Sequence, residues 1–387
     1  MTSDESVFQP SLVGIPGPSR IVFGRGGCVT VGDTVAEFGR KAMIVAGKSS
    51  ISSGLLDRIK AQLDGLGLDY EVYGKVSQNP TKDIVDDGAA FASAADCDVV
   101  LALGGGSQMD AAKAMAFMAV NKGRTVDYGR GPGEDTSFKA LPVVAVPTTC
   151  GTGSENNGIC VLTDPDTRDK GGFTGKVLVP KASIVDPDLM ETMPRRVMSA
   201  VSFDALSHLI ESYVSSAADT GTDNACRTGL RLMSEGLVAA NDNNLDREAL
   251  DKVVLASTLA GYTIFQAGTV VPHAMEHPLS GLKDIVHGRG LAAISPEIYE
   301  RSVPGSPERF SEISRLFGGK DEKDIRTAIG SLISRIGVET TLSEEGFGHD
   351  DIPWLVESVE RTGGSKLTRN PVRFTTSDFR AVYEACM

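Results

Sequence analysis

The segment LALGGGSQMDAAKAMAF, residues 101–117, joins an apolar run to a helical pattern through three consecutive glycines. Glycine adopts positive φ angles and lets the backbone approach a bound group closely. Ser107 and Asp110 have the spacing of a capping box, which predicts a helix that begins at Ser107. The free N–H groups and positive dipole of such a helix start favour an anion such as phosphate. The segment lacks the GxGxxG motif, so a simple tight turn is the alternative interpretation.

Strand patterns alternate with helical patterns on both sides of this segment. Apolar and β-branched runs occupy residues 41–47, 70–76, 98–105, 141–149 and 182–187. Helical patterns occupy residues 51–67 and 81–96 between them. This alternation predicts a parallel sheet that is covered by helices on both faces. A second glycine-rich stretch, GRGG at 24–27, is a poorer candidate for phosphate binding because no crossover helix opens directly from it.

The chain beyond Pro194 contains only helical patterns, separated by turn-rich breaks. The change occurs near the segment DPDLMETMPRR, residues 186–196. No internal repeat or low-complexity segment interrupts either half. We therefore expect an α/β domain over residues 1–190 and an all-α domain over residues 191–387.

The composition limits the classes of function. The 387 residues are 41% hydrophobic and 23% charged, which is typical of a globular chain. A net charge of −13 argues against nucleic-acid partners and against an anionic membrane surface. No apolar run reaches membrane-spanning length, and the acidic, polar N-terminus is unlike a secretory signal. The six cysteines lack CxxC or disulfide-framework spacing, which predicts reduced thiols and a cytoplasmic protein.

Hydroxyl side chains gather after the next predicted strand, in the segment VPTTCGTGSE at 146–155. They belong to Thr148, Thr149, Thr152 and Ser154. Ligands of open α/β sheets bind in the crevice outside the carboxyl ends of the strands. Two polar turns after successive strands therefore predict a binding crevice, although each hydroxyl alone would also suit a solvated loop.

Four of the five histidines and one aspartate form a pattern that is typical of a metal site. Asp204 and His208 are four residues apart, as are His273 and His277, so each pair shares a face if its segment is helical. His287 follows in the same segment as the second pair. Imidazole is the commonest metal ligand among side chains. The competing interpretation is a set of hydrogen-bonded core histidines, which is the usual role of an isolated histidine.

The chain resembles the iron-containing (group III) alcohol dehydrogenases over nearly its whole length. The motifs that carry the resemblance are GGGSxxDxxK at 104–113, PTTxGTGSE at 147–155, DxxxH at 204–208 and HxxxHPLSxxxxxxHG at 273–288. The resemblance implies a Rossmann-like dinucleotide domain, a helical domain and a metal in the cleft between them, an architecture shared with dehydroquinate synthase-like enzymes. It implies that Asp204, His208, His273 and His287 are the metal ligands, and that His277 takes part in proton transfer.

The same resemblance implies a nicotinamide dinucleotide bound against the two polar turns. The implied cofactor-binding residues are Gly104, Gly105, Gly106 and Ser107 at the pyrophosphate, Asp110 in the adjoining helix turn, Thr148 and Thr149 beside the cofactor, and Lys176.

Family members that prefer NAD often carry an aspartate after the strand at 41–46, where this chain has Gly47 followed by Lys48. A carboxylate would repel a 2′-phosphate, whereas a glycine beside a lysine would accept one. We therefore expect NADP(H) to be favoured over NAD(H). The alternative is that Lys48 and the serines after it form only a solvated loop.

Together these features predict a metal-dependent oxidoreductase that interconverts a small primary alcohol and its aldehyde by hydride transfer with NAD(P)(H). Three imidazoles and a carboxylate suit Fe²⁺ or Zn²⁺, and the resemblance favours iron. The alternatives are polyol-phosphate, hydroxy-acid or maleylacetate-reductase-like enzymes of the same fold. Lys283 and Arg289 flank His287 and would suit an anionic substrate, although surface exposure is the simpler expectation. We expect a homodimer or larger homo-oligomer, with His349 in a solvated loop.

Overall fold

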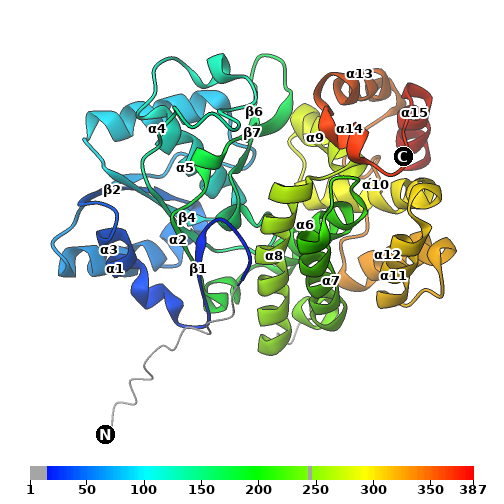
Figure 1. Cartoon of the computed structure of the whole chain (residues 1–387), viewed down its shortest axis with the longest axis horizontal. Coiled ribbons are helices and arrows are strands. Elements are labelled where there is room, and N and C mark those ends of the chain that lie inside the picture. The colour runs from blue at the N-terminus through cyan, green and yellow to red at the C-terminus, as the bar shows by residue number, and fades with distance from the viewer. Residues whose placement is uncertain (1–14, 243–245) are drawn as a thin grey trace, which may run out of the picture.

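The computed structural model describes residues 15–242 and 246–387, so the polar N-terminal segment discussed above lies outside the described residues. Figure 1 shows two halves side by side, with the strands in the blue-to-green half and only helices in the green-to-red half. Within the described residues, all strands lie between Arg20 and Val185, and every element from Arg195 onward is helical. This arrangement confirms the predicted fold class, an α/β half with a parallel sheet followed by an all-α half.

Six parallel strands form the central sheet in the order β1-β8-β5-β4-β2-β3. They are β1 (Arg20–Phe23), β2 (Lys41–Ala46), β3 (Asp69–Tyr73), β4 (Val99–Gly104), β5 (Val143–Pro147) and β8 (Ala182–Val185). Strand β4 is central, and its Leu101 is in register with Ile44 of β2 and Val144 of β5. All five runs predicted from the sequence are strands of this sheet.

The alternating side chains of β4 face two different hydrophobic cores. Val100 and Ala102 face the core shared with α4 (Lys82–Ala94) and α5 (Gly106–Met118). Leu101 and Leu103 face the core shared with α1 (Val31–Ala36) and α3 (Leu55–Gly65). The short helix α2 (Lys48–Ser52) precedes α3 in the chain. Both faces of the sheet are therefore covered, which explains why this strand is apolar along its whole length.

The order of the strands reverses between β2 and β4. From β2 the chain continues outward to β3, and it then returns across β2 to form β4 on the other side. Open α/β sheets bind ligands at such a reversal, outside the carboxyl ends of the strands. Gly47 follows the carboxyl end of β2, and the glycine turn follows that of β4, so both lie at this point.

The sequence analysis did not predict three strands: β1, β6 (Ile159–Thr163) and β7 (Lys170–Thr174). Strands β6 and β7 form a separate antiparallel hairpin. Two consecutive glycines in β7 conceal its strand character, because glycine has low strand propensity. The hairpin lies at the boundary between the two halves (Figure 1). It packs against α9 (Val271–Lys283), the helix that carries His273 and His277.

The second half is built from ten helices among the described residues. They are α6 (Arg195–Val214), α7 (Thr220–Ala240), α8 (Arg247–Ala267), α9, α10 (His287–Ser302), α11 (Pro307–Leu316), α12 (Ile325–Ile336), α13 (Ile352–Thr362), α14 (Ser365–Arg369) and α15 (Thr376–Ala385). One core lies among α6, α7, α8, α11 and α12, and a second lies among α9, α10, α13 and α15. No single described helix is long and apolar enough to cross a membrane. Only α8 and α9 pass that criterion jointly, as a pair bent by 105°.

Helix α5 begins at Gly106, so the predicted start at Ser107 and the predicted capping box are wrong. Gly105 is the N-cap residue, and its N–H donates to Oε1 of Gln108 at 3.2 Å. Gln108 therefore does the capping that the sequence pattern had assigned to Asp110. Asp110 is instead turned into the protein interior, where only 7% of the residue is exposed.

Asp110 and Lys113 attach the second polar turn to α5. Ser154 Oγ donates to the Asp110 carboxylate at 2.5 Å, and the Val161 N–H donates to it at 2.8 Å. Lys113 Nζ is fully buried and donates to the carbonyl oxygens of Ser154 and Ile159 at 2.9 and 2.6 Å. Because the buried ammonium lies 3.7 Å from the Asp110 carboxylate, each charge compensates the other. The two polar turns are therefore held together as one rigid unit.

Replacing Lys113 with methionine should lower the free energy of unfolding by about 3–5 kcal/mol, because it removes the charge that compensates the buried Asp110 carboxylate and the donor of two buried carbonyls. Chemical denaturation of the variant and the parent measures this difference. The matched control is Lys75→Met, which removes an exposed ion pair with Asp87 and should change stability by less than about 1 kcal/mol. Equal effects of the two substitutions would contradict the structural role given to Lys113.

Candidate functional site

Three helices supply the side chains of the predicted metal site. Asp204 and His208 lie on α6, His273 lies on α9, and His287 is the first residue of α10. The segment that contains His273 and His277 is helical, so these two side chains lie on one face of α9, as the sequence predicted. All three helices belong to the second half, so the site depends on how they pack against one another.

A missing side chain lets α10 approach α6 closely. Any Cβ at position 288 would collide with the backbone carbonyl of Ala200 on α6. Gly288 immediately follows His287, so this contact between backbones holds the start of α10 beside the α6 face that carries Asp204. The approach requires glycine for reasons of space, since nothing in its φ angle requires it.

Three of the predicted ligands, Asp204, His208 and His273, form one compact group, and His287 approaches it through Asp204. The Nε2 atoms of His208, His273 and His287 lie 3.6, 3.4 and 3.6 Å from Oδ1 of Asp204. Ligand atoms about 2.1 Å from a shared ion in a tetrahedral arrangement lie about 3.4 Å from each other. Asp204 Oδ1 and His273 Nε2 are buried without a hydrogen-bond partner among the described residues, which is unusual for polar atoms. These side chains therefore fit a divalent transition-metal cation.

Glu211 orients His273 from the side opposite Asp204. Its carboxylate contacts Nδ1 of His273 at 2.5 Å and also accepts from Ser207 Oγ and from the Val270 N–H, both at 2.8 Å. Such a carboxylate fixes the imidazole tautomer and leaves Nε2 free for a metal. Sequence analysis did not identify Glu211, although its position one turn after His208 on α6 was a usable signal.

Glu276 orients His287 in the same way as Glu211 orients His273. Its fully buried carboxylate contacts Nδ1 of His287 and accepts from Ser280 Oγ. Burial alone would raise the pKa of Glu276, but the charges of His287 and Lys170 hold it below its usual range. Glu276 also forms a group with His277 and His287 whose ligand atoms lie close together. Because its carboxylate already bonds His287, we assign it to orientation of that ring.

His277 borders the cluster of ligand atoms without joining it. It is 5% exposed, and its ring centroid lies 6.1 Å from that of His273 and 5.7 Å from that of His287. Burial, followed by the charge of Lys366, holds the pKa of His277 well below its usual range. The imidazole is therefore neutral at physiological pH and can accept a proton. His349, by contrast, lies in an exposed short helix, as expected of a solvated position.

Two cavities meet at the histidines. The glycine-turn cavity, of about 340 Å³, lies beside the start of α5. The hairpin cavity, of about 700 Å³, lies beside β6, β7 and α14. His208, His273 and His277 line both cavities, so ligands that occupied both would meet at the candidate metal site. Both volumes are typical of cavities that hold small molecules.

The predicted cofactor-binding residues separate into two groups. Those that line the glycine-turn cavity are Gly105, Gly106, Ser107, Asp110 and Thr149. Those that do not line it are Gly47, Gly104, Thr148 and Lys176. Gly47 is buried next to Gln108, a lining residue, and the Thr148 N–H donates to the Gly104 carbonyl at 2.9 Å. Thr152, which also lines the cavity, belongs to a motif that the sequence analysis had quoted.

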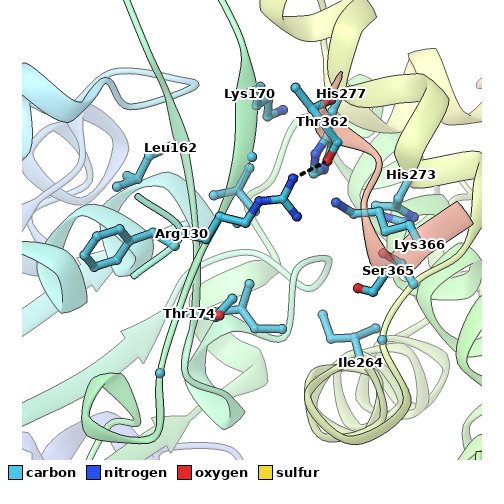
Figure 2. Close-up of a pocket in the computed structure, with 18 of the residues that line it drawn as sticks. Arg130, Leu162, Lys170, Thr174, Ile264, His273, His277, Thr362, Ser365 and Lys366 are labelled. Atoms are coloured by element: carbon cyan, nitrogen blue, oxygen red, sulfur yellow. Dashed lines mark hydrogen bonds between the residues drawn. The ribbon is translucent and has the colours of Figure 1, made fainter. Parts of the chain in front are cut away.

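Lys170 lies deeper in the cleft than Lys176, the lysine that the family resemblance assigns to the cofactor. Lys176 is exposed and pairs with Glu134 at 2.6 Å, at the outer part of the hairpin cavity. Lys170, on β7, is 6% exposed, lines both cavities and has Nζ 3.5 Å from Nδ1 of His287. Figure 2 shows it near His277 at the inner end of the hairpin cavity. Lys170 was not identified from the sequence because strand β7, which begins at this residue, was not predicted.

Comparison with known families identifies the chain. The iron-containing alcohol dehydrogenase model matches residues 18–187, and the C-terminal model of the Fe-containing alcohol dehydrogenase family matches residues 198–387. The chain belongs to the iron-containing alcohol dehydrogenase family. The resemblance inferred from the motifs is thereby confirmed.

Individual members of this family are similar over most of their length. Long-chain-alcohol dehydrogenase 1 of Geobacillus thermodenitrificans is 32% identical over 89% of this chain and 88% of its own. The NAD-dependent methanol dehydrogenase of Bacillus methanolicus is 31% identical over 88% of this chain and 92% of its own. The crystal structure of the archaeal Red Sea brine pool alcohol dehydrogenase ADH/D1 matches with a TM-score of 0.89 and 32% identity, covering 98% and 99% of the two chains.

Family membership defines the chemistry in general terms. The protein interconverts an alcohol and its aldehyde, and the family implies iron and a nicotinamide cofactor. Small-molecule alcohols or aldehydes are the substrates. The alternative classes considered from the sequence, such as polyol-phosphate dehydrogenases, are not favoured by these relatives.

Metal affinity should depend on pH because His273 carries a proton in the metal-free site. Burial opposes that proton, but Glu211 and Asp204 raise the pKa of His273 to about 9, while burial lowers the pKa of His208 to about 4. Just below pH 9 a cation must displace the proton of His273, so affinity should rise about tenfold per pH unit between about pH 7 and 9 and then level off. Zn²⁺ titrations of the metal-free protein measure the slope. A profile without slope across this range would contradict the assignment of His273.

Proposed function

We propose that Asp204, His208, His273 and His287 hold the metal, with iron as the resident ion and zinc as the alternative. The observation that carries this proposal is the arrangement of three Nε2 atoms around an unpartnered buried carboxylate oxygen. Three neutral imidazoles and one carboxylate leave the ion with a net positive charge. When bound, such an ion acts as a Lewis acid toward the substrate oxygen.

We propose that His277 moves the proton in the reaction. Its imidazole is neutral, buried and part of the lining of both cavities, so it can accept a proton from a substrate hydroxyl. In the reverse direction it returns the proton to the oxygen of the reduced aldehyde. Water has little access to the ring, because its residue is 5% exposed.

The glycine-turn cavity is our proposed cofactor site, and the bound nicotinamide supplies or accepts the hydride. Gly105 and Gly106 leave space for a pyrophosphate at the N-terminus of α5, where free N–H groups favour an anion. Thr149 and Lys170 extend the same wall toward the histidines. Their positions support a contact of Lys170, rather than Lys176, with the cofactor.

Substitution of the two α9 histidines should separate metal binding from proton transfer. His273→Ala should lose both the metal and activity, because it removes a ligand atom. His277→Ala should keep a full equivalent of metal while kcat falls about a hundredfold or more, since a positioned proton carrier contributes roughly that factor. Metal analysis and steady-state kinetics of the same preparations test this, with exposed His349→Ala as the unaffected control. Metal loss in His277→Ala would make this residue a ligand.

We propose that the protein uses NADP(H) in preference to NAD(H). Gly47 presents no carboxylate at the end of β2, and Lys48 directly after it is exposed and makes no ion pair with any described residue. Ser50 does not contribute to this preference, because its hydroxyl donates to the Leu103 carbonyl at 3.3 Å. The proposed preference for NADP(H) therefore depends on the absence of a carboxylate at Gly47 and on Lys48.

A carboxylate restored at position 47 should shift the preference toward NADH. We expect Gly47→Asp to lower the ratio of kcat/KM for NADPH to that for NADH by about tenfold or more, because the carboxylate repels a 2′-phosphate. Gly47→Asn is the matched control, since it has the same size without the charge. Both substitutions require Gln108 to move slightly, because a Cβ would lie 3.1 Å from its Cδ. A parent enzyme that strongly prefers NADH would overturn the proposal.

The homo-oligomeric state and the cytoplasmic location remain predictions from the sequence. The first of these rests on the family resemblance of the sequence alone. The second rests on the reduced cysteines, and all six are free thiols within the described residues.

A further inference from the structure

The hairpin cavity contains acidic side chains, and each of them already has a cationic partner. The pairs are Asp164 with Lys82 at 3.1 Å, Asp169 with Arg361 at 2.7 Å, and Glu134 with Lys176 at 2.6 Å. The negative charge that lines this cavity is therefore neutralised by neighbouring residues. Any further cation in the cavity has no carboxylate left to pair with.

Four further cations line the same cavity: Lys170, which contacts His287, and Arg130, Lys366 and Arg369. Across residues 15–242 and 246–387, none of them forms an ion pair with a carboxylate. Lys366 also makes no hydrogen bond through its ammonium group, and Arg130 donates only to the Thr362 carbonyl, at 3.2 Å. Figure 2 shows the side chains of Arg130 and Lys366 pointing toward one another across the open space.

Two glycines make room for the guanidinium groups. A Cβ at Gly364 would collide with Nη1 of Arg130, and a Cβ at Gly268 would collide with Nη1 of Arg369. Both glycines have positive φ angles, of 53° and 73°, which other residues rarely adopt. The two glycines therefore let both guanidinium groups pack against the backbone, although the positive charge of Lys366 lies nearby.

The cluster of like charges is electrostatically unfavourable without an anion. Burial, followed by the charge of Arg130, lowers the pKa of Lys366 to about 8, and Arg369 adds to the effect. The only acidic group that opposes this shift is Glu211, which is already bonded to His273. Buried or half-buried charges in proteins are normally paired, so an anionic group bound in this cavity would stabilise the cations.

The same cavity reaches the candidate metal site. His208, His273 and His277 line it, and the charge of Lys366 is close enough to lower the pKa of His277. The apolar side chains of Ile264 and Phe265 also line the cavity. A short aliphatic substrate can therefore reach the histidines with one polar end and the cations with the other.

We propose that the physiological substrate is an alcohol or aldehyde whose far end carries an anionic group, a carboxylate, sulfonate or phosphate, bound by Lys366 with Arg130 and Arg369. This inference rests on the proposed function, because the aldehyde carbon must lie at the histidines. It favours a hydroxy acid or a phosphorylated alcohol on the cavity of this chain alone, since the relatives named above do not favour those classes. The anionic group takes no part in the reaction: the aldehyde gains a hydride from the reduced nicotinamide and a proton, and the oxidised nicotinamide leaves. Arginine and lysine make strong charge-assisted hydrogen bonds to such groups.

The two cations suggested by the sequence do not serve this purpose. Lys283 pairs with Asp351 at 2.7 Å, and Arg289 contacts Glu345 at 2.5 Å. Neither residue lines the hairpin cavity. Recognition of an anionic group therefore falls to residues that lie far from His287 in the sequence.

Matched aldehydes that differ only in a terminal carboxylate test the inference. We expect kcat/KM for 4-oxobutanoate to exceed that for butanal by about tenfold or more, and the same for 5-oxopentanoate against pentanal. Without any nicotinamide present, 4-hydroxybutanoate should bind more tightly than 1-butanol in calorimetric titration of the metal-loaded protein. High salt should reduce both differences, because it screens the charges.

Substitutions of the cations identify the residues responsible. Lys366→Met should reduce the preference for 4-oxobutanoate over butanal by about tenfold to a hundredfold, and Lys366→Arg should restore most of it. Lys283→Met, which removes a cation outside the cavity, should leave the preference unchanged. Should Lys366→Met not fold, Arg130→Gln on the exposed loop provides the same measurement.

The outcomes distinguish failure of this inference from failure of the proposed function. Turnover of butanal with no advantage for 4-oxobutanoate would overturn the inference and leave the function intact. Absence of turnover with every aldehyde and both cofactors would overturn the function. A rise in the KM for NADPH in Lys366→Met, with the aldehyde preference unchanged, would assign the cations to the cofactor and would also overturn the inference.

Discussion

The structure depends on one buried carboxylate that has three imidazole nitrogens within 3.6 Å and no hydrogen bond of its own at Oδ1. Asp204 is 4% exposed, so its negative charge is removed from water and requires a compensating cation. Three helices must converge for the imidazoles to reach it, and each of two imidazoles is held by a second carboxylate. The positions of these few atoms therefore constrain how α6, α9 and α10 pack against one another.

The two halves of the molecule contribute different things to one reaction. The sheet half supplies glycine turns at a point where the strand order reverses, and the helical half supplies the candidate metal ligands. The β6–β7 hairpin connects them, because it extends from the sheet half and brings Lys170 against the histidines. Neither half alone contains both the proposed cofactor site and the candidate metal site, so we expect activity to require the interface between them.

Local patterns were sufficient to predict the sheet and the helical half, whereas the set of metal ligands came from the family resemblance and stays a prediction. Alternation of apolar strands with helices is a property of short segments, and the i,i+4 spacing of Asp204 and His208 needs only one helix. The hairpin was missed because Gly171 and Gly172 interrupt its strand pattern. The cations Arg130 and Lys366 were missed because they are distant in the sequence and meet only after folding. The capping error arose because interior partners draw Asp110 inward.

The three imidazole donors have a consequence for ion selectivity. Calcium is a hard cation that takes about six to eight oxygen ligands, and magnesium also prefers oxygen. The ring nitrogens of His208, His273 and His287 suit softer first-row transition metals instead. The type of donor atom therefore discriminates against alkaline-earth ions.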